Sequence, residues 1–117
     1  MIRGGVKLAT TQLKKGTLEL CVLALLSHNE WYGYELTQEL NQVMIVKDAT
    51  IYLILQRLEK AGLVSSYIKT LDDSTKVRKY YTITKSGNEG LQTLVNEWNS
   101  LGDIVTACIE KGRVTND

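Results

Sequence analysis

The side chains that most often carry out catalysis or bind metals are scarce in this chain of 117 residues. There is one histidine, His28, and there are two cysteines, Cys21 and Cys108, which form no CxxC pair. Together they supply too few ligands for a structural zinc site, and His28 has no recognisable nucleophile or carboxylate partner. We therefore predict no catalytic residues, no metal and no cofactor, and we expect a protein that is not an enzyme.

Basic side chains offer another kind of chemistry, the binding of phosphate groups, and they are unevenly distributed. The net charge is only +1, from 14 basic and 13 acidic residues, which by itself argues weakly against nucleic-acid binding. However, residues 1–15 hold four basic residues and no acidic one, and residues 47–85 hold eight basic residues against four acidic ones. Residues 16–46 and 86–110 each hold four acidic residues and no basic one. Because DNA binding needs positive charge only where phosphates lie, residues 47–85 are the candidate contact segment.

Hydrophobic spacing predicts the elements that must position these charges. Apolar residues recur at helical spacing in three segments: Thr11 to about His28, Tyr32 to Met44, and Asp48 to Ala61, the last ended by Gly62. Strand-like runs follow at Leu63–Leu71 and Lys76–Ile83, separated by the turn signal Asp72-Asp73-Ser74-Thr75, and Thr84 can cap a final helix. This order predicts a mainly α fold with a small β-hairpin, which matches a winged helix-turn-helix with a long C-terminal dimerisation helix.

These elements divide the chain into three parts. We expect a flexible N-terminal arm over residues 1–10, a winged-helix DNA-binding domain over 11–83, and a C-terminal dimerisation helix and tail over 84–117. No apolar run is long enough to span a bilayer, and the cysteine content is typical of a reducing compartment. We therefore expect a cytoplasmic protein with no membrane partner.

The apolar stripes also predict which side chains face outward. In the second helix, Leu36, Leu40 and Val43 are expected on the inner side. In the third, the stripe Ile51, Ile54, Leu55 and Leu58 faces the core and leaves Lys47, Asp48, Thr50, Tyr52, Leu53 and Gln56 outward. Strand alternation places Lys79, Tyr81 and Ile83 on the inner face of the hairpin and Arg78, Tyr80 and Thr82 on the other.

A heptad pattern marks the last helix. Leu91, Trp98 and Val105 recur at heptad spacing, and Leu94, Leu101 and Cys108 form the adjoining row. This seam either folds back on the protein's own core or packs against a second copy, and its terminal position favours a homodimer. Cys108 is then expected to be a buried thiol in the seam, with a redox switch as the alternative.

Three segments share motifs with a known family: KKGTLELCVLALLSHNEWYGYEL (Lys14–Leu36), ATIYLILQRLEKAGLV (Ala49–Val64) and RKYYTITKSG (Arg78–Gly87). In this order and spacing they resemble the PadR family of bacterial transcriptional regulators, and the resemblance runs from Lys14 to Trp98. The single C-terminal helix is similar to the short branch of the family, whose members are dimeric repressors, some of which sense planar aromatic drugs. Two positions differ from the family pattern: Lys47 replaces the usual Ser or Asn cap, and Leu53 stands where proline is frequent.

The helix order and the charge distribution together define candidate DNA-binding residues. Side chains near the N-terminus of a recognition helix reach base edges in helix-turn-helix docking. Thr50 can contact a thymine methyl or a phosphate, Gln56 can pair with adenine, and Tyr52 can contact a phosphate unless it packs against the wing. The candidates are Lys47, Thr50, Tyr52 and Gln56 on the helix, and Lys76, Arg78 and Lys79 on the wing, for which a solvated hairpin face is the alternative.

Trp98 is the candidate ligand-binding residue. The resemblance aligns it, in the motif NEWNSL, with a tryptophan that stacks on planar aromatic ligands between subunits in drug-sensing members. Its alternative role is that of a hydrophobic anchor of the dimer. We therefore predict a homodimeric, sequence-specific DNA-binding repressor that a planar aromatic small molecule can relieve. The alternative is a winged-helix protein-interaction module that does not read DNA.

Overall fold

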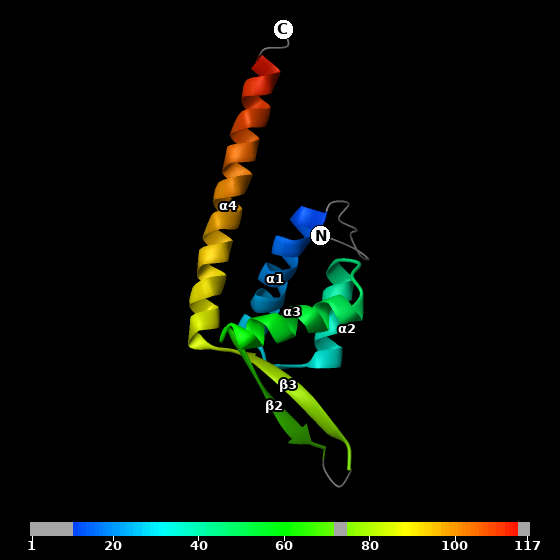
Figure 1. Ribbon diagram of the computed structural model, residues 1–117. Helices are drawn as coiled ribbons and strands as arrows, with labels where there is room; N and C mark the ends of the chain where they lie inside the picture. The colour runs from blue at the N-terminus through cyan, green and yellow to red at the C-terminus, as the bar shows by residue number, and fades with distance from the viewer. Residues whose placement is uncertain (1–10, 72–74, 115–117) are drawn as a thin grey trace.

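The structure, a computed structural model that describes residues 11–71 and 75–114, consists of helices and a small antiparallel sheet whose hairpin projects away from them (Figure 1). In order, the described elements are α1 (Thr11–His28), β1 (Trp31–Tyr32), α2 (Gly33–Val43), α3 (Asp48–Lys60), β2 (Val64–Thr70), β3 (Val77–Ile83) and α4 (Lys85–Val114). The predicted mainly α fold with a hairpin is confirmed. The predicted arm over residues 1–10, the turn residues 72–74 and the tail residues 115–117 lie outside the described part of the chain.

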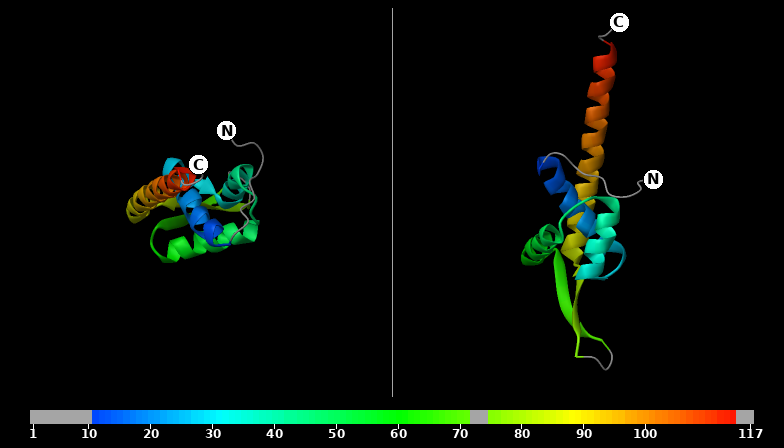
Figure 2. Two further views of the ribbon diagram at one scale, coloured as in Figure 1. Left: turned by 90° about the horizontal axis from the view of Figure 1, so that it is seen from above. Right: turned by 90° about the vertical axis from the view of Figure 1, so that its right-hand side faces the viewer.

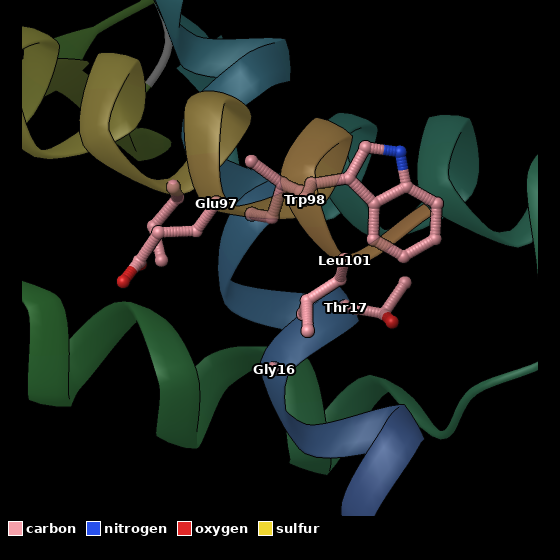
Figure 3. A pocket seen from close by; sticks show the side chains of 7 residues that line it. Gly16, Thr17, Glu97, Trp98 and Leu101 are labelled. Atoms are coloured by element: carbon pink, nitrogen blue, oxygen red, sulfur yellow. The ribbon is translucent and has the colours of Figure 1, made fainter. Parts of the chain in front are cut away.

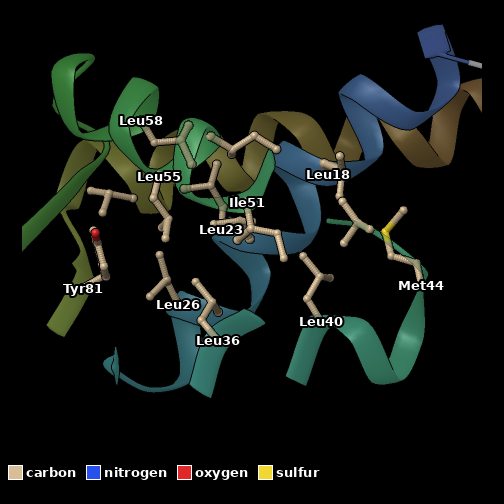
Figure 4. Close-up of a cluster of buried hydrophobic side chains, with 14 residues drawn as sticks. Leu18, Leu23, Leu26, Leu36, Leu40, Met44, Ile51, Leu55, Leu58 and Tyr81 are labelled. Carbon is tan, nitrogen blue, oxygen red and sulfur yellow. The ribbon is translucent and has the colours of Figure 1, made fainter. Parts of the chain in front are cut away.

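Helices α1, α2 and α3 converge on one core, which is drawn in Figure 4. The apolar stripe of α3 is buried as predicted, and Ile51 and Leu55 have no exposed surface. Leu23 of α1 and Leu36 of α2 are equally inaccessible. Full burial of such a side chain stabilises the fold by about 2 kcal/mol, so the core fixes α3 with its opposite face outward.

The end of α2 differs from the prediction. Val43 was expected on the inner side together with Leu36 and Leu40, but its side chain is 44% exposed. The helix ends at Val43, and Met44 has an extended backbone with φ −146° and ψ 150°. This change of direction turns Met44 into the core in place of Val43, so Met44 is buried.

The sheet contains one strand more than the predicted hairpin, in the order β1–β3–β2. The short strand β1 pairs Trp31 with Tyr81 and Tyr32 with Tyr80. The Nε1–H group of Trp31 donates a hydrogen bond to the carbonyl oxygen of Leu25 at 2.9 Å, which ties β1 to the end of α1. Trp31 is therefore a packing residue.

Gly62, Thr84 and Gly87 form a joint that connects the head, defined here as residues 11–83, to α4. Gly62 ends α3 with φ 79°, the left-handed conformation predicted for it. The hydroxyl of Thr84 accepts a hydrogen bond from the N–H group of Gly87 at 2.9 Å and donates one to the carbonyl of Gly62 at 2.7 Å. A Cβ atom at Gly87 would collide with the carbonyl of Leu63, so glycine lets α4 begin directly against the residue that precedes β2. Thr84 is thus the predicted helix cap and also a link to the head.

Helix α4 passes along the head and then extends beyond it, as Figure 1 and the right-hand view of Figure 2 show. Leu91 and Leu94 are half-buried and pack against the core of the head. Every residue from 96 to 113 is exposed, and the molecule measures 71 × 30 × 23 Å along its principal axes. The predicted seam is therefore divided: its first part folds back on the protein's own core, and the part from Trp98 onward is uncovered.

Candidate nucleic-acid interface

Asn41 holds the turn between α2 and α3 and so determines how α3 is presented. Its Oδ1 accepts a hydrogen bond from the N–H group of Val46 at 3.2 Å, and its Nδ2 donates one to the carbonyl of Thr37 at 2.8 Å. Nδ2 also lies 3.4 Å from Oδ1 of Asp48, in the first turn of α3. Asn41 is missing from the predicted site because nothing in the spacing of α2 distinguishes it from the other polar residues there.

The predicted contact residues of α3 lie on the side of the helix opposite the core. Lys47, at the N-cap position, and Gln56 are exposed, and Thr50 is half-buried. The carbonyl of Lys47 accepts the N–H group of Thr50 at 3.0 Å, and its side chain makes no capping hydrogen bond. The side chain of Lys47 therefore does not cap α3. The residue is exposed at the N-terminal end of the helix.

Tyr52 packs against a neighbouring element and is still partly exposed, and its predicted contact with a phosphate stays a prediction. A Cβ atom at Gly33 would lie 3.0 Å from the edge of the Tyr52 ring and 3.3 Å from its hydroxyl, so the ring packs against the start of α2. The side chain is nevertheless 41% exposed. Burial, followed by the neighbouring Tyr81, raises the pKa of the Tyr52 phenol, which therefore keeps its proton and can donate it in a hydrogen bond. Its hydroxyl lies beside a helix N-terminus, where backbone N–H groups favour an anion.

The basic residues of the wing, β2 and β3 with their turn, point to opposite faces, as strand alternation predicts. Lys79 lies on the inner face, 5.5 Å above the centre of the buried Tyr81 ring and 3.9 Å from a carboxylate oxygen of Glu59. Arg78 lies on the outer face, 4.6 Å above the centre of the Tyr32 ring. Lys76 is exposed close to the turn. The structure thus separates Lys79 from Arg78 rather than joining them in one patch.

A row of tyrosines covers the outer face of the wing. The rings of Tyr67 and Tyr80 stack with their centres 5.6 Å apart, and the rings of Tyr32 and Tyr80 are 6.0 Å apart. Lys69 lies 5.4 Å above the Tyr80 ring, and the hydroxyl of Tyr67 donates a hydrogen bond to Glu30 at 2.7 Å, which raises the pKa of that phenol. Aromatic pairs and cation–π contacts of this kind stiffen a hairpin. The alternation of side chains along both strands is the sequence signal that could have predicted which tyrosines share this face.

Arg57 joins α3 to α1 instead of extending the basic surface. Its guanidinium lies 3.2 Å from a carboxylate oxygen of Glu19. Glu59, two residues further along α3, is not this partner. Glu59 instead accepts a hydrogen bond from the hydroxyl of Ser66 at 2.6 Å and pairs with Lys79. Both Arg57 and Lys79 are thus partly neutralised within the head.

A groove of about 220 Å³ lies between α1 and α4, where Trp98 leaves the head (Figure 3). Its lining is mostly apolar, with one acidic side chain, Glu97, and consists of Gly16, Thr17, Leu20, Leu94, Glu97, Trp98 and Leu101. Trp98 and Leu101 are more than half exposed. The predicted ligand-binding tryptophan therefore lies in a groove that is open to solvent on one side in the single chain.

In the part of the chain that the structure describes, the side chains that could bind a metal do not gather into a site, and the two cysteines differ in burial. Within 11–71 and 75–114, no group of three or more His, Cys, Asp or Glu side chains could hold a metal ion. None of the helices in these ranges has the length and apolar character needed to cross a bilayer. Cys21 is half-buried, which raises the pKa of its thiol, whereas Cys108 is exposed on α4.

A family model, a sequence relative and solved structures each match more than half of this chain. The model of the transcriptional regulator PadR-like family matches residues 22–93. A protein of Lysinibacillus sphaericus is 37% identical over 100 residues, which cover 82% of this chain and 91% of that protein. A PadR-like transcriptional regulator from Bacillus cereus is 34% identical, with 85% of this chain and 97% of that one covered and a TM-score of 0.73. A padr family transcriptional regulator from Eggerthella lenta is also 34% identical, with 85% and 87% covered and a TM-score of 0.74.

Proposed function

This chain belongs to the transcriptional regulator PadR-like family, and on that premise we propose that it is a homodimeric repressor that recognises a specific DNA sequence. The observation that carries the proposal is the exposed side of α3 beside a wing with basic side chains. Regulation of transcription through DNA binding follows from the family, whose members are generally not enzymes. The proposal adds the DNA-contacting residues, the dimer, the repression and a ligand.

In the proposed complex α3 enters the major groove and the wing follows the adjacent backbone. Gln56 and Thr50 are placed to meet base edges, and Lys47 and the hydroxyl of Tyr52 to meet phosphates. On the wing, Lys76 and Arg78 supply phosphate contacts. Lys79, which is paired with Glu59, contributes less. The head is thus the proposed DNA-binding domain, and residues 84–117 are the proposed dimerisation segment.

The proposed dimer forms through the uncovered part of α4. Trp98, Leu101, Ile104, Val105 and Ile109 are each at least half exposed, and they recur at spacings that place them along one side of the helix. A contiguous apolar surface of this kind on one helix is typical of an interface. Pairing it with the same surface of a second copy gives two-fold symmetric reading heads, which suits a palindromic operator.

The proposed ligand is a planar aromatic molecule, preferably cationic, that stacks on Trp98. The groove is apolar, as stacking requires, and Glu97 supplies a negative charge at its edge. Because the groove lies between the head and the proposed seam, a bound ligand would contact both. A change in the angle between the two heads would then relieve repression.

DNA binding is tested by fluorescence anisotropy, with a duplex that the protein selects from random sequence and a scrambled duplex, at two salt concentrations. We expect specific binding that weakens with salt, because phosphate contacts release counterions. The double variant Lys76→Ala/Arg78→Ala should bind both duplexes more weakly and lower the salt slope by about two. Lys111→Ala, in the last turn of α4, is the matched control and should change neither. Binding without any sequence preference would instead favour the protein-interaction module.

Ligand binding is tested separately in the absence of DNA, by quenching of tryptophan fluorescence with ethidium and, because Trp98→Ala also removes a fluorophore, by the anisotropy of the ethidium fluorescence itself. Quenching should disappear in Trp98→Ala and persist in Trp31→Phe, which keeps an aromatic ring in the packed position beside α1. Equal loss of quenching in the two variants would contradict a site at Trp98.

A further inference from the structure

One ridge of α3 lies farthest from the core, and its first half is apolar. The buried positions are Ile51, Ile54, Leu55 and Leu58. At helical spacing the line directly opposite them passes through Ala49, Leu53, Gln56 and Lys60, and all four residues are exposed. Thr50 and Tyr52 flank this ridge, and Thr50 is half-buried. If α3 enters the major groove of DNA, Ala49 and Leu53 are therefore the residues of the N-terminal half of the ridge that lie nearest the bases.

Leu53 is the most prominent side chain of this ridge. It is 64% exposed, the highest exposed fraction among the large hydrophobic residues of the described chain. A single exposed leucine is unremarkable on an ordinary surface. The position of Leu53 makes its exposure informative, because the residues near the N-terminus of a recognition helix are those that contact base edges. Ala49, one turn earlier on the ridge, is small and exposed.

The chemistry of leucine selects among base pairs. In the major groove adenine, guanine and cytosine present hydrogen-bonding groups, whereas thymine adds the apolar 5-methyl group. The side chain of leucine can neither donate nor accept a hydrogen bond. When it covers a polar base edge, it displaces water without replacing the hydrogen bonds that the water made. Against a thymine methyl it loses nothing and buries apolar surface on both partners.

We infer that Leu53 is a specificity-determining residue that reads the 5-methyl group of a thymine in the operator. This inference rests on the proposed function and adds a base preference to it. It also distinguishes Leu53 from Gln56 on the same ridge, which reads a base edge through hydrogen bonds.

The test replaces thymine by deoxyuridine, one position at a time, in the duplex that the protein selects from random sequence. This substitution removes one methyl group and leaves the base pairing intact. Wild-type protein should bind the duplex about fourfold more weakly when the thymine that Leu53 contacts is replaced, as expected for one buried methyl group. Leu53→Ala should bind the thymine and deoxyuridine duplexes equally at that position. Gln56→Ala, the matched control, should keep the fourfold difference there.

The outcomes separate this inference from the proposed function. Specific binding in which no single thymine replacement matters, or in which Leu53→Ala keeps the wild-type difference, contradicts the role of Leu53 alone. Absence of any specific binding contradicts the proposed function and the inference with it. Because Leu53 is exposed, its truncation leaves the core intact, and an unchanged unfolding midpoint of Leu53→Ala verifies this.

Discussion

At the scale of one residue, Tyr52 would combine packing with DNA recognition in the proposed complex. Its ring fills the space that Gly33 leaves at the start of α2, so it supports the angle between α2 and α3. Its hydroxyl is the part that can reach a phosphate. The two contributions can be separated, because phenylalanine retains the first and loses the second.

We predict that Tyr52→Phe binds the selected duplex about tenfold more weakly, because a hydrogen bond to a charged group is lost. Its unfolding midpoint in urea should remain that of the wild type, since the ring still packs against Gly33. Tyr52→Ala should lower both the affinity and the midpoint. If Tyr52→Phe keeps full affinity in the anisotropy assay, the hydroxyl makes no contact with DNA.

At the scale of elements, the joint at Thr84 is the feature on which both halves of the molecule depend. One hydroxyl satisfies the N–H group of Gly87 in the first turn of α4 and the carbonyl of Gly62 after α3. The joint therefore links the end of α3, the proposed recognition helix, to the start of α4, the proposed dimerisation helix. The joint and the packing of Leu91 and Leu94 on the core together set the direction of α4 relative to α3.

Thr84→Ala should lower the free energy of unfolding by about 1–2 kcal/mol, because α4 loses its cap and Gly62 loses a donor. Urea denaturation followed by circular dichroism measures this difference. Thr93→Ala is the control, since Thr93 only donates to the carbonyl of Glu89 from an exposed position within α4. It should change stability little, as alanine is the better helix former. Equal losses in the two variants would show that the joint has no special role.

The order of elements could be predicted because each major element is long enough to show its own period. The stripe of α3, the left-handed Gly62 and the cap at Thr84 are local signals, and the structure contains all three. The strand β1 could not be predicted, because two residues carry no period and pair only with the distant Tyr80 and Tyr81. Val43 was misassigned because a helical period does not reveal where the helix ends.

The candidate site was predictable to the same extent. Which residues of α3 face outward follows from its stripe, so the exposure of Lys47 and Gln56 agrees with the prediction. Ion pairs such as that of Arg57 with Glu19 depend on how α1 and α3 pack, and no sequence spacing reveals them. The same reason explains why Asn41 was missed.

At the scale of the whole molecule, a head is attached to a long helix whose outer part is exposed on all sides. Apolar side chains such as Trp98 and Leu101 lie there without cover in the described chain. A second copy would bury them and would also close the open side of the groove at Trp98. Dimerisation and ligand binding are therefore coupled in the proposed function.

Leu101→Glu should weaken the dimer at least about tenfold, because a carboxylate would be buried in an apolar seam. Sedimentation equilibrium measures the dissociation constant, and circular dichroism should show an unchanged helix content, since Leu101 is exposed in the single chain. Asn96→Glu introduces the same charge on the opposite side of α4 and should leave the dimer intact. A wild-type protein that sediments as a monomer, or equal weakening by the two variants, would contradict this interface.

The joint at Thr84 has a mechanical consequence. Helix α4 spans 30 residues, which at the α-helical rise makes it about 45 Å long. A rotation of about 5° at its base moves its far end by about 4 Å, a displacement comparable to the rise of one DNA base-pair step. In the proposed function, a small molecule beside Trp98 would press on α4 about 20 Å from Thr84, beyond Leu91 and Leu94, which pack on the core, and would change the angle of the outer part of the helix. In the proposed function, such small angular changes of α4 would become base-pair-sized errors in register along an operator.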